Sequence, residues 1–204
     1  MEIELKYRMK EGIGAGILDD EMVASISDRN REVLDMDSTY YDTEDRRLSQ
    51  DGIALRVRRE NENYMATLKW SGESEDGLHR RQEINIPLGE QFSRPVTAAI
   101  FEQSEMYDRL MELTGGAQLT GFLKTRFVRK QERLDSGTFI CMISVDEGRT
   151  LAGGREEPFS ELEIELYSGS ESDMKAFGRR LAEKFGLEPE NTSKYARGLA
   201  LLEK

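Results

Sequence analysis

The sequence has few of the residues on which most enzyme active sites depend. It contains one cysteine, Cys141, and one histidine, His79, in 204 residues. A single cysteine excludes an intramolecular disulfide and any cysteine-cluster metal site, and a single histidine excludes zinc sites with several histidines. A Ser-His-Asp or Cys-His enzyme would depend on His79 alone. What remains is chemistry performed by carboxylates, lysines, arginines and metal ions bound through oxygen.

Long apolar runs are also missing. No segment approaches the roughly 18 apolar residues that a membrane span requires, and residues 1–6 lack the apolar stretch of a secretion signal. We therefore expect a cytoplasmic protein that makes no use of a membrane. The 40 acidic residues outnumber the 29 basic ones and give a net charge of -11. This charge opposes broad binding to nucleic acid, so no nucleic-acid partner is expected.

Alternation of apolar and polar residues, which is typical of β-strands, recurs along the chain. In residues 2–9 it places Glu2, Glu4 and Lys6 on one face and Ile3, Leu5 and Tyr7 on the other. Further strands are expected over residues 32–42, 53–59, 64–70, 78–88, 122–134, 138–145 and 159–167. Loops are expected at residues 12–16, 71–77 and 148–158, which are rich in glycine or polar residues.

Helical periodicity is weak over residues 19–26 and clearer over 96–113 and 173–185, where Gly186 would end the helix. A last helix is expected over 191–202, capped by Asn191 or Thr192. No linker or repeat divides the chain, so we expect one domain over residues 1–204, with strands mainly in 2–167 and C-terminal helices in 171–202. These elements predict an α+β fold, an eight-stranded antiparallel β-barrel with helices packed outside.

The polar faces of these strands carry charges that are sorted by strand. Residues two apart share a face at a spacing of about 6.5 Å. Basic residues dominate the middle strands, with Arg56, Arg58, Lys69, Arg81, Lys124 and Arg126. Acidic residues dominate the first and last strands, with Glu2, Glu4, Glu161, Glu163 and Glu165.

For any one strand, a solvated outer face is the simplest interpretation of such a row. A solvated surface usually mixes both signs, however, and three glutamates in one row repel one another unless cations lie nearby. The sorting therefore favours a barrel with a charged interior. Carboxylates on one wall would hold a hard divalent cation, and lysines and arginines on the others would hold a multiply charged anion. Phosphoryl transfer needs this combination.

The same residues carry a resemblance to a known family. Glu2-Ile3-Glu4-Leu5-Lys6 matches the ExExK signature of the CYTH domain, whose members are also called triphosphate tunnel metalloenzymes. Other segments resemble family motifs in the same order, namely residues 40–43 (YYDT), 52–58 (GIALRVR), 67–69 (TLK), 79–83 (HRRQE), 124–126 (KTR), Asp146, 161–166 (ELEIEL) and 193–195 (SKY). Together they cover nearly the whole chain.

The resemblance implies a barrel that forms a tunnel, Mg²⁺ or Mn²⁺ as cofactor, and a substrate with a linear triphosphate. It assigns the metal ion to Glu2, Glu4, Asp146, Glu163 and Glu165. It assigns phosphate binding to Lys6, Arg56, Arg58, Lys69, Arg81, Lys124, Arg126 and Lys194. The catalytic set it implies is Glu2, Glu4, Lys6, Glu163 and Glu165.

Three positions stay open at this point. A bulge in the strand could turn Arg80 rather than Arg81 into the tunnel. Glu83 could pair with a phosphate-binding arginine instead of a metal ion, and Glu161 could lie at the tunnel mouth. His79 receives no role, and Cys141 is expected to be a structural thiol within a strand.

Several activities occur among the proteins that the sequence resembles. We expect hydrolysis of a small-molecule triphosphate, inorganic triphosphate first, because the 160–166 run (SELEIEL) resembles bacterial inorganic triphosphatases. The long segment after Asp146 also departs from the compact glycine turn of class IV adenylate cyclases. The alternatives are such a cyclase, a thiamine or nucleoside triphosphatase, and a sensor that binds polyphosphate or nucleotide without turnover. The expected helices could support a homodimer, which nothing in the sequence demands.

Overall fold

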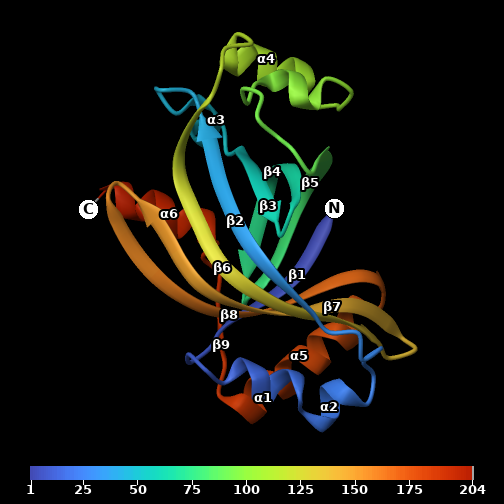
Figure 1. Ribbon diagram of the computed structural model, residues 1–204. Helices are drawn as coiled ribbons and strands as arrows, with labels where there is room; N and C mark the ends of the chain where they lie inside the picture. Colours follow the sequence, from blue (N-terminus) through green and yellow to red (C-terminus); the bar gives the residue numbers. More distant parts are fainter. Residues whose placement is uncertain (204) are drawn as a thin grey trace.

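Eight antiparallel strands curl into a closed barrel in the computed structural model, which describes residues 1–203 (Figure 1). They are β1 (Glu2–Arg8), β2 (Glu32–Asp42), β3 (Ala54–Glu60), β4 (Asn63–Glu75), β5 (Leu78–Gly89), β6 (Thr120–Asp135), β7 (Phe139–Ala152) and β8 (Arg155–Gly169). Their order is β5-β4-β3-β2-β6-β7-β8-β1, and pairing of β1 with β5 closes the barrel. The short β9 (Glu188–Pro189) adds to β1. The predicted eight-stranded α+β barrel is thus confirmed.

Six α-helices and one 3₁₀ turn accompany the strands. They are α1 (Gly14–Leu18), α2 (Glu21–Ala24), α3 (Arg47–Gln50), the 3₁₀ turn η1 (Ala98–Phe101), α4 (Tyr107–Thr114), α5 (Glu171–Phe185) and α6 (Lys194–Glu203). In Figure 1, α1, α2 and α5 lie together below the barrel, and α4 lies at its top. Within residues 1–203 no helix has the length and apolar character needed to cross a membrane.

The two largest apolar cores lie outside the barrel, between its strands and the helices. In the larger cluster, Leu5 and Ile164 of β1 and β8 pack with Phe177 of α5. In the second cluster, Leu68 of β4 packs with Phe101 of η1 among others. Because successive side chains of a strand point to opposite faces, an apolar outer face leaves the polar residues facing inward. Helix packing on the outside therefore dictates a charged interior.

The structure corrects four local predictions. The loop expected over residues 71–77 is reduced to a tight turn, because β4 continues to Glu75 and pairs with β5 there. The loop expected over residues 148–158 is absent, because β7 and β8 continue through it and meet at a tight turn. Gly153 and Gly154 form this turn with φ of 58° and 75°, which glycine adopts without a side-chain clash. The helix expected over 96–113 is interrupted between η1 and α4. The glycine-rich segment expected as a loop contains α1.

One helix reaches the inner surface of the barrel. Gly198 of α6 packs on Leu123 of β6 so closely that an added Cβ would lie 2.0 Å from Leu123 Cδ1. Tyr195 of α6 stacks against Tyr40 of β2, with ring centroids 5.0 Å apart. The helix begins after Ser193, whose hydroxyl accepts a hydrogen bond from the Ala196 amide, rather than at the expected caps, Asn191 or Thr192. The first turn of α6 is thereby placed next to the charged interior.

Candidate active site

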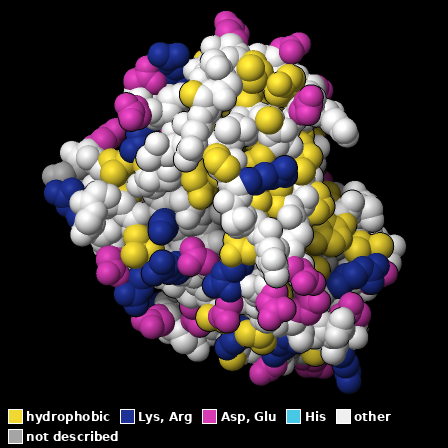
Figure 2. All heavy atoms as spheres, turned by 45° about the horizontal axis from the view of Figure 1, so that its top comes forward, with side chains coloured by type: hydrophobic (Ala, Val, Ile, Leu, Met, Phe, Trp, Pro, Cys, Tyr) yellow, Lys and Arg dark blue, Asp and Glu magenta, His cyan; other side chains and the backbone are white. Residues whose placement is uncertain are grey.

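A cavity of about 270 Å³ lies inside the barrel and is lined largely by charged side chains. Seven are basic and five are acidic, although the whole chain has a net charge of -11. The basic residues are Lys6, Arg56, Arg58, Lys69, Arg81, Arg129 and Lys194, and the acidic ones are Glu2, Glu4, Glu83, Glu163 and Glu165. The outer surface, by contrast, intersperses both signs on the face shown in Figure 2. The local charge of the cavity, not the net charge, decides what it attracts.

The alternation of β1 turns its polar residues into this cavity, as predicted. Glu4 lies directly across from Glu165 of β8, and Lys6 lies across from Glu163. The Lys6 ammonium is 3.0 Å from the Glu163 carboxylate and 3.2 Å from that of Glu4. Burial alone would lower the pKa of Lys6, but Glu163 and Glu4 raise it above its ordinary value. Lys6 is therefore a fixed cation between two carboxylates.

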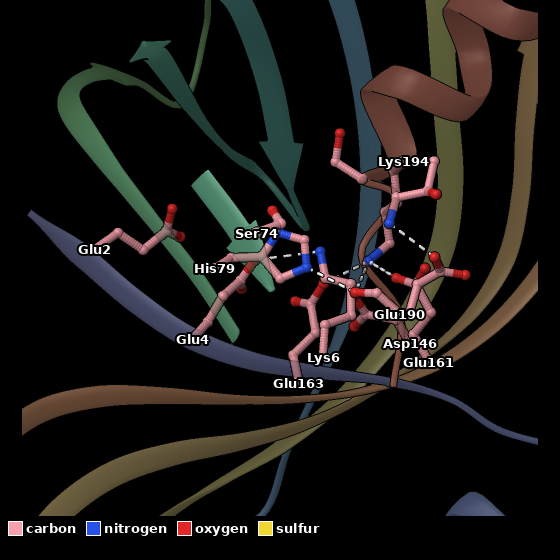
Figure 3. A network of polar contacts seen from close by, with 12 residues as sticks. Glu2, Glu4, Lys6, Ser74, His79, Asp146, Glu161, Glu163, Glu190 and Lys194 are labelled. Atoms are coloured by element: carbon pink, nitrogen blue, oxygen red, sulfur yellow. Dashed lines mark hydrogen bonds and ion pairs between the residues drawn. The ribbon is translucent and has the colours of Figure 1, made fainter. Parts of the chain in front are cut away.

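A second group of acids lies behind this row, on β7 and β8. Carboxylate oxygens of Asp146, Glu161 and Glu163 lie within 4.8 Å of one another. The Lys194 ammonium of α6 contacts all three, at 2.8 Å, 2.5 Å and 2.8 Å respectively (Figure 3). Arg129 of β6 binds Asp146 through two nitrogens at 2.7 Å. These charges compensate one another inside the chain.

Glu161 is also held by Arg197 of α6 and is fully buried, so it does not lie at a tunnel mouth. Asp146 is equally buried and does not line the cavity. The structure thus brings the acidic residues of the sequence prediction together, but divides them into two groups. Asp146 and Glu161 lie in the compensated group, Glu2, Glu4 and Glu165 face the open cavity, and Glu163 belongs to both.

Two of the carboxylates that face the cavity, Glu165 and Glu2, have raised pKa values. Glu165 forms no ion pair with any residue in 1–203, and burial together with the Glu4 charge raises its pKa. Burial raises the pKa of Glu2 to about 7, even though Lys69 lies 2.7 Å away and opposes the shift. Acids with raised pKa values in a cavity mark a place where a cation would be stabilised.

The opposite wall, formed by β3, β4 and β5, presents surplus positive charge. Arg56 and Arg58 of β3 point into the cavity, and the Nε atom of each is buried without a hydrogen-bond partner among the described residues. Burial, followed by the charge of Arg56, lowers the pKa of Arg58 to about 10. Two guanidinium groups side by side, with donors unused, are arranged to receive an anion.

Two basic residues of the sequence prediction, Lys124 and Arg126, lie outside the cavity. Both are exposed on the outer face of β6, where the Arg126 side chain is 56% exposed and lies 3.2 Å from Asp37. The prediction of an inward orientation was wrong because both faces of this strand carry basic residues. Arg129, three positions after Arg126, is on the inner face with Phe127 and was missed. Phe127 could have indicated the inner face of this strand, because a large aromatic residue is usually buried, and Arg129 shares its face.

The choice between Arg80 and Arg81 on β5, which the sequence left open, is resolved. Arg81 lines the cavity, whereas Arg80 turns to the outside and binds Glu171 of α5 at 2.6 Å. His79 is 1% exposed and lies 2.7 Å from the Arg81 guanidinium through Nδ1. Because the guanidinium can only donate, Nδ1 accepts and Nε2–H donates to the Glu190 carbonyl. The histidine to which the sequence gave no role thus orients a cavity arginine as a neutral side chain.

Cys141 is buried, and burial raises the pKa of its thiol to about 12. A thiol in this environment stays protonated and is a poor nucleophile.

A hard divalent cation fits the acidic side of the cavity. Glu2, Glu4 and Glu165 offer carboxylate oxygens, the ligand type that Mg²⁺ and Mn²⁺ prefer. Glu165 lacks a cationic partner in the described chain, so a metal ion there would supply missing charge. Among the described residues, only the compensated group has three carboxylate oxygens within 4.8 Å of one another, and Lys194, Arg129 and Arg197 already neutralise it. The cavity carboxylates therefore offer the donor type and the missing charge for a metal ion, whereas the compensated group offers the spacing.

Comparison with known proteins agrees with this arrangement. Residues 1–199 match the family described as CYTH domain. An inorganic triphosphatase from Haemophilus influenzae is 30% identical over 200 residues, which are 98% of this chain and 54% of that protein. The chain thus spans about half the length of that curated relative.

Solved structures share the fold at low sequence identity. A protein from Hippeastrum, described as a proposed adenylyl cyclase with a dominant triphosphatase activity, has a TM-score of 0.75 and 21% identity, and the match covers 98% of this chain and 96% of that one. The Mimivirus capping enzyme triphosphatase has a TM-score of 0.56 and 11% identity over 90% of this chain and 88% of its own. At these identities the likeness concerns the barrel itself.

Proposed function

Because the chain belongs to the CYTH domain family, we propose that its barrel cavity binds and hydrolyses a linear triphosphate, with inorganic triphosphate as substrate and Mg²⁺ or Mn²⁺ as cofactor. The observation that carries this proposal is the pairing of two unlike walls. One wall offers two arginines whose buried Nε atoms have no hydrogen-bond partner among the described residues, and the facing wall offers Glu165, which has no ion-pair partner among them. A bound polyanion would pair with the arginines of one wall, and a divalent cation would pair with the carboxylate of the other.

The size and polarity of the cavity support a small inorganic substrate. Pockets that enclose drug-sized ligands usually measure about 300–1000 Å³ and are mostly apolar. This cavity measures about 270 Å³ and is lined mainly by charged groups, so it suits a chain of phosphates better than a whole nucleotide. Charged strand faces also oppose a carrier barrel for apolar molecules. The relative from Haemophilus influenzae is itself called an inorganic triphosphatase.

The roles of the residues follow from their positions. Arg56, Arg58 and Arg81 would bind the phosphate oxygens and stabilise the charge that develops on the leaving pyrophosphate. Glu165, which faces the same cavity, would orient the attacking water. None of these four side chains would form a bond to phosphorus.

Glu2, Glu4 and Glu165 would hold the metal ion, with Glu163 as a further ligand on the same wall. The bound cation would neutralise phosphate charge in the transition state. Asp146, which the sequence analysis assigned to the metal ion, would instead position basic side chains. Its carboxylate fixes Arg129 and Lys194, which keeps Lys194 at the edge of the cavity.

Phosphate release from inorganic triphosphate, ATP and thiamine triphosphate tests the proposal, each measured with Mg²⁺, with Mn²⁺ and with a chelator. We expect metal-dependent release that is fastest with inorganic triphosphate. Conversion of ATP to cyclic AMP on the same samples would replace the proposal with a cyclase. Binding of triphosphate without turnover would make the cavity a sensor.

A further inference from the structure

Glu83 of β5 is a cavity carboxylate that the proposed mechanism does not use. Its side chain is 16% exposed and lies directly across from Lys69 of β4, whose ammonium is 2.6 Å away. The same ammonium lies 2.7 Å from the Glu2 carboxylate of β1. One lysine is therefore shared by two glutamates, which its three N–H donors allow.

A second set of contacts leads from Glu83 to the arginine wall. Asn85 donates to the Glu83 carboxylate at 2.5 Å and accepts from the Thr67 hydroxyl at 2.7 Å. The Thr67 oxygen in turn accepts from the Arg56 guanidinium at 3.3 Å. Since the single hydroxyl hydrogen of Thr67 is used toward Asn85, its lone pairs face Arg56.

The geometry of the sheet makes this chain of contacts a continuous row. Arg56, Thr67 and Asn85 are successive partners across β3, β4 and β5, and Lys69 and Glu83 form the next row. Glu83 thus touches one phosphate-binding cation and reaches another through two intermediates.

The two glutamates that share Lys69 differ in their other contacts. Glu83 lies directly across from Lys69 on the neighbouring strand and also accepts a hydrogen bond from Asn85. Burial alone would raise the pKa of Glu83, but Lys69, Arg56 and Asn85 lower it to about 2. Glu2 lies on β1, and Lys69 is its only ion-pair partner within residues 1–203. Glu83 therefore stays beside Lys69 when Glu2 exchanges its partner.

We propose that Glu83 is a positioning residue that retains Lys69 on the β4–β5 wall and aligns Arg56 through Asn85 and Thr67, so that Glu2 is released for the metal ion. The inference rests on the proposed function of the cavity, whose residues it orders. Glu83 itself contacts neither phosphate nor metal. Without it, Lys69 would pair with Glu2 alone and compete with the cation at that carboxylate.

The first experiment measures Mn²⁺ binding by electron paramagnetic resonance without substrate, in the wild type and in Glu83→Gln. The glutamine keeps the size of the side chain and an oxygen that can accept from Asn85. We expect Mn²⁺ affinity to fall about 10- to 100-fold, the usual effect of losing a group that orients a metal ligand. The control is Glu62→Gln, in the exposed β3–β4 turn, which removes the same charge and should leave Mn²⁺ affinity unchanged.

A double-mutant cycle with Lys69→Met decides whether Glu83 acts through Lys69. If it does, Glu83→Gln will change Mn²⁺ affinity little in the Lys69→Met background. An equal loss in both backgrounds would mean that Glu83 acts as a metal ligand or as a general charge, and would overturn the proposal. Glu83→Asp, which restores the charge, should recover part of the affinity and also serves if the glutamine variant does not fold.

The contacts toward Arg56 have a separate readout. Asn85→Ala should raise the KM for inorganic triphosphate with little change in Mn²⁺ affinity, because it interrupts only the path to the arginine. Mn²⁺ binding needs no turnover, so a wild type that binds Mn²⁺ and hydrolyses nothing would refute the proposed activity and leave the Glu83 cycle decisive. A wild type that binds no Mn²⁺ would refute the release of Glu2 for a metal ion.

Discussion

The two walls of the cavity use the same kinds of charged residue in different ways. On the wall built from β7, β8 and α6, Asp146, Glu161 and Glu163 are matched by Lys194, Arg129 and Arg197 at ion-pair distance. On the wall built from β3, Arg56 and Arg58 keep buried donors without a partner. Every acid of the first wall thus has an ion-pair partner, whereas on the second wall Arg58 pairs with Glu60 and Arg56 has no carboxylate at ion-pair distance within residues 1–203.

This difference separates structural charge from functional charge within one cavity. A buried ion pair that is fully matched adds little net stability, but it is costly to break because one charge is then left alone in a poorly solvated place. Unmatched buried charge costs stability in the free protein and is recovered only on binding. We therefore expect substitutions on the first wall to affect folding and substitutions on the second to affect catalysis.

The largest expected effect is on the matched wall. Lys194→Met leaves three buried carboxylates short of a cation, and we expect it to lower the free energy of unfolding by about 3–5 kcal/mol, measured by urea denaturation. Lys184→Met is the control, because Lys184 pairs with Asp20 at the surface and should contribute about 0–1 kcal/mol. Equal losses in the two variants would contradict the distinction between the walls.

The next effect is on the unmatched wall. Arg56→Ala should reduce kcat/KM for inorganic triphosphate by an amount equal to about 2–4 kcal/mol of transition-state stabilisation, since it removes one charged donor to the developing charge. The unfolding free energy should fall less than in Lys194→Met, because Arg56 is held by a hydrogen bond to Thr67 and has no carboxylate at ion-pair distance within residues 1–203. Arg59→Ala, on the outer side of the same strand, should affect neither quantity. A strongly destabilised Arg56→Ala with normal turnover would reverse the assignment of the walls.

A smaller effect concerns pH. The pKa of Glu2 is raised by burial from 4.5 to about 7 in the folded protein, so between these values the folded state binds a proton that the unfolded state has lost. The free energy of unfolding of the metal-free protein should therefore fall as pH rises through this window, by on the order of 1 kcal/mol per pH unit.

Glu2→Gln should remove this part of the pH dependence, since glutamine does not titrate. Glu11→Gln, at an exposed position, should preserve it. Urea denaturation at several pH values with chelator present measures the slope. An unchanged slope in Glu2→Gln would assign the titration to another carboxylate.

The alternation of β1, β3 and β8 was sufficient to predict which of their residues face inward. In these strands one face is mostly apolar, as with Leu5 and Tyr7 opposite Glu4 and Lys6, so only one orientation buries the apolar residues. The succession of such alternating strands along the chain also predicted the barrel. A pattern that packs one face under helices determines both the core and the cavity.

What the sequence could not predict depends on contacts between distant segments. Glu161 is buried because Arg197 of α6 reaches it, and this helix enters the barrel only where Gly198 allows close contact with Leu123. The division of the acids into two groups has the same origin, since Lys194 compensates one group and not the other. Such partners lie about 30 or more residues away and leave no local periodicity.

The smallest expected effect tests the strand on which the sequence prediction was wrong. Lys124 and Arg126 lie on the exposed outer face of β6, so the double replacement by alanine should change the free energy of unfolding by less than about 0.5 kcal/mol and leave kcat/KM unchanged. Arg129→Ala is the matched comparison, because Arg129 lies three residues further along the same strand on the inner face and binds Asp146 and Glu163. It should lose both stability and activity. A loss of kcat/KM in the double variant with a normal Arg129→Ala would mean that β6 turns its other face to the substrate.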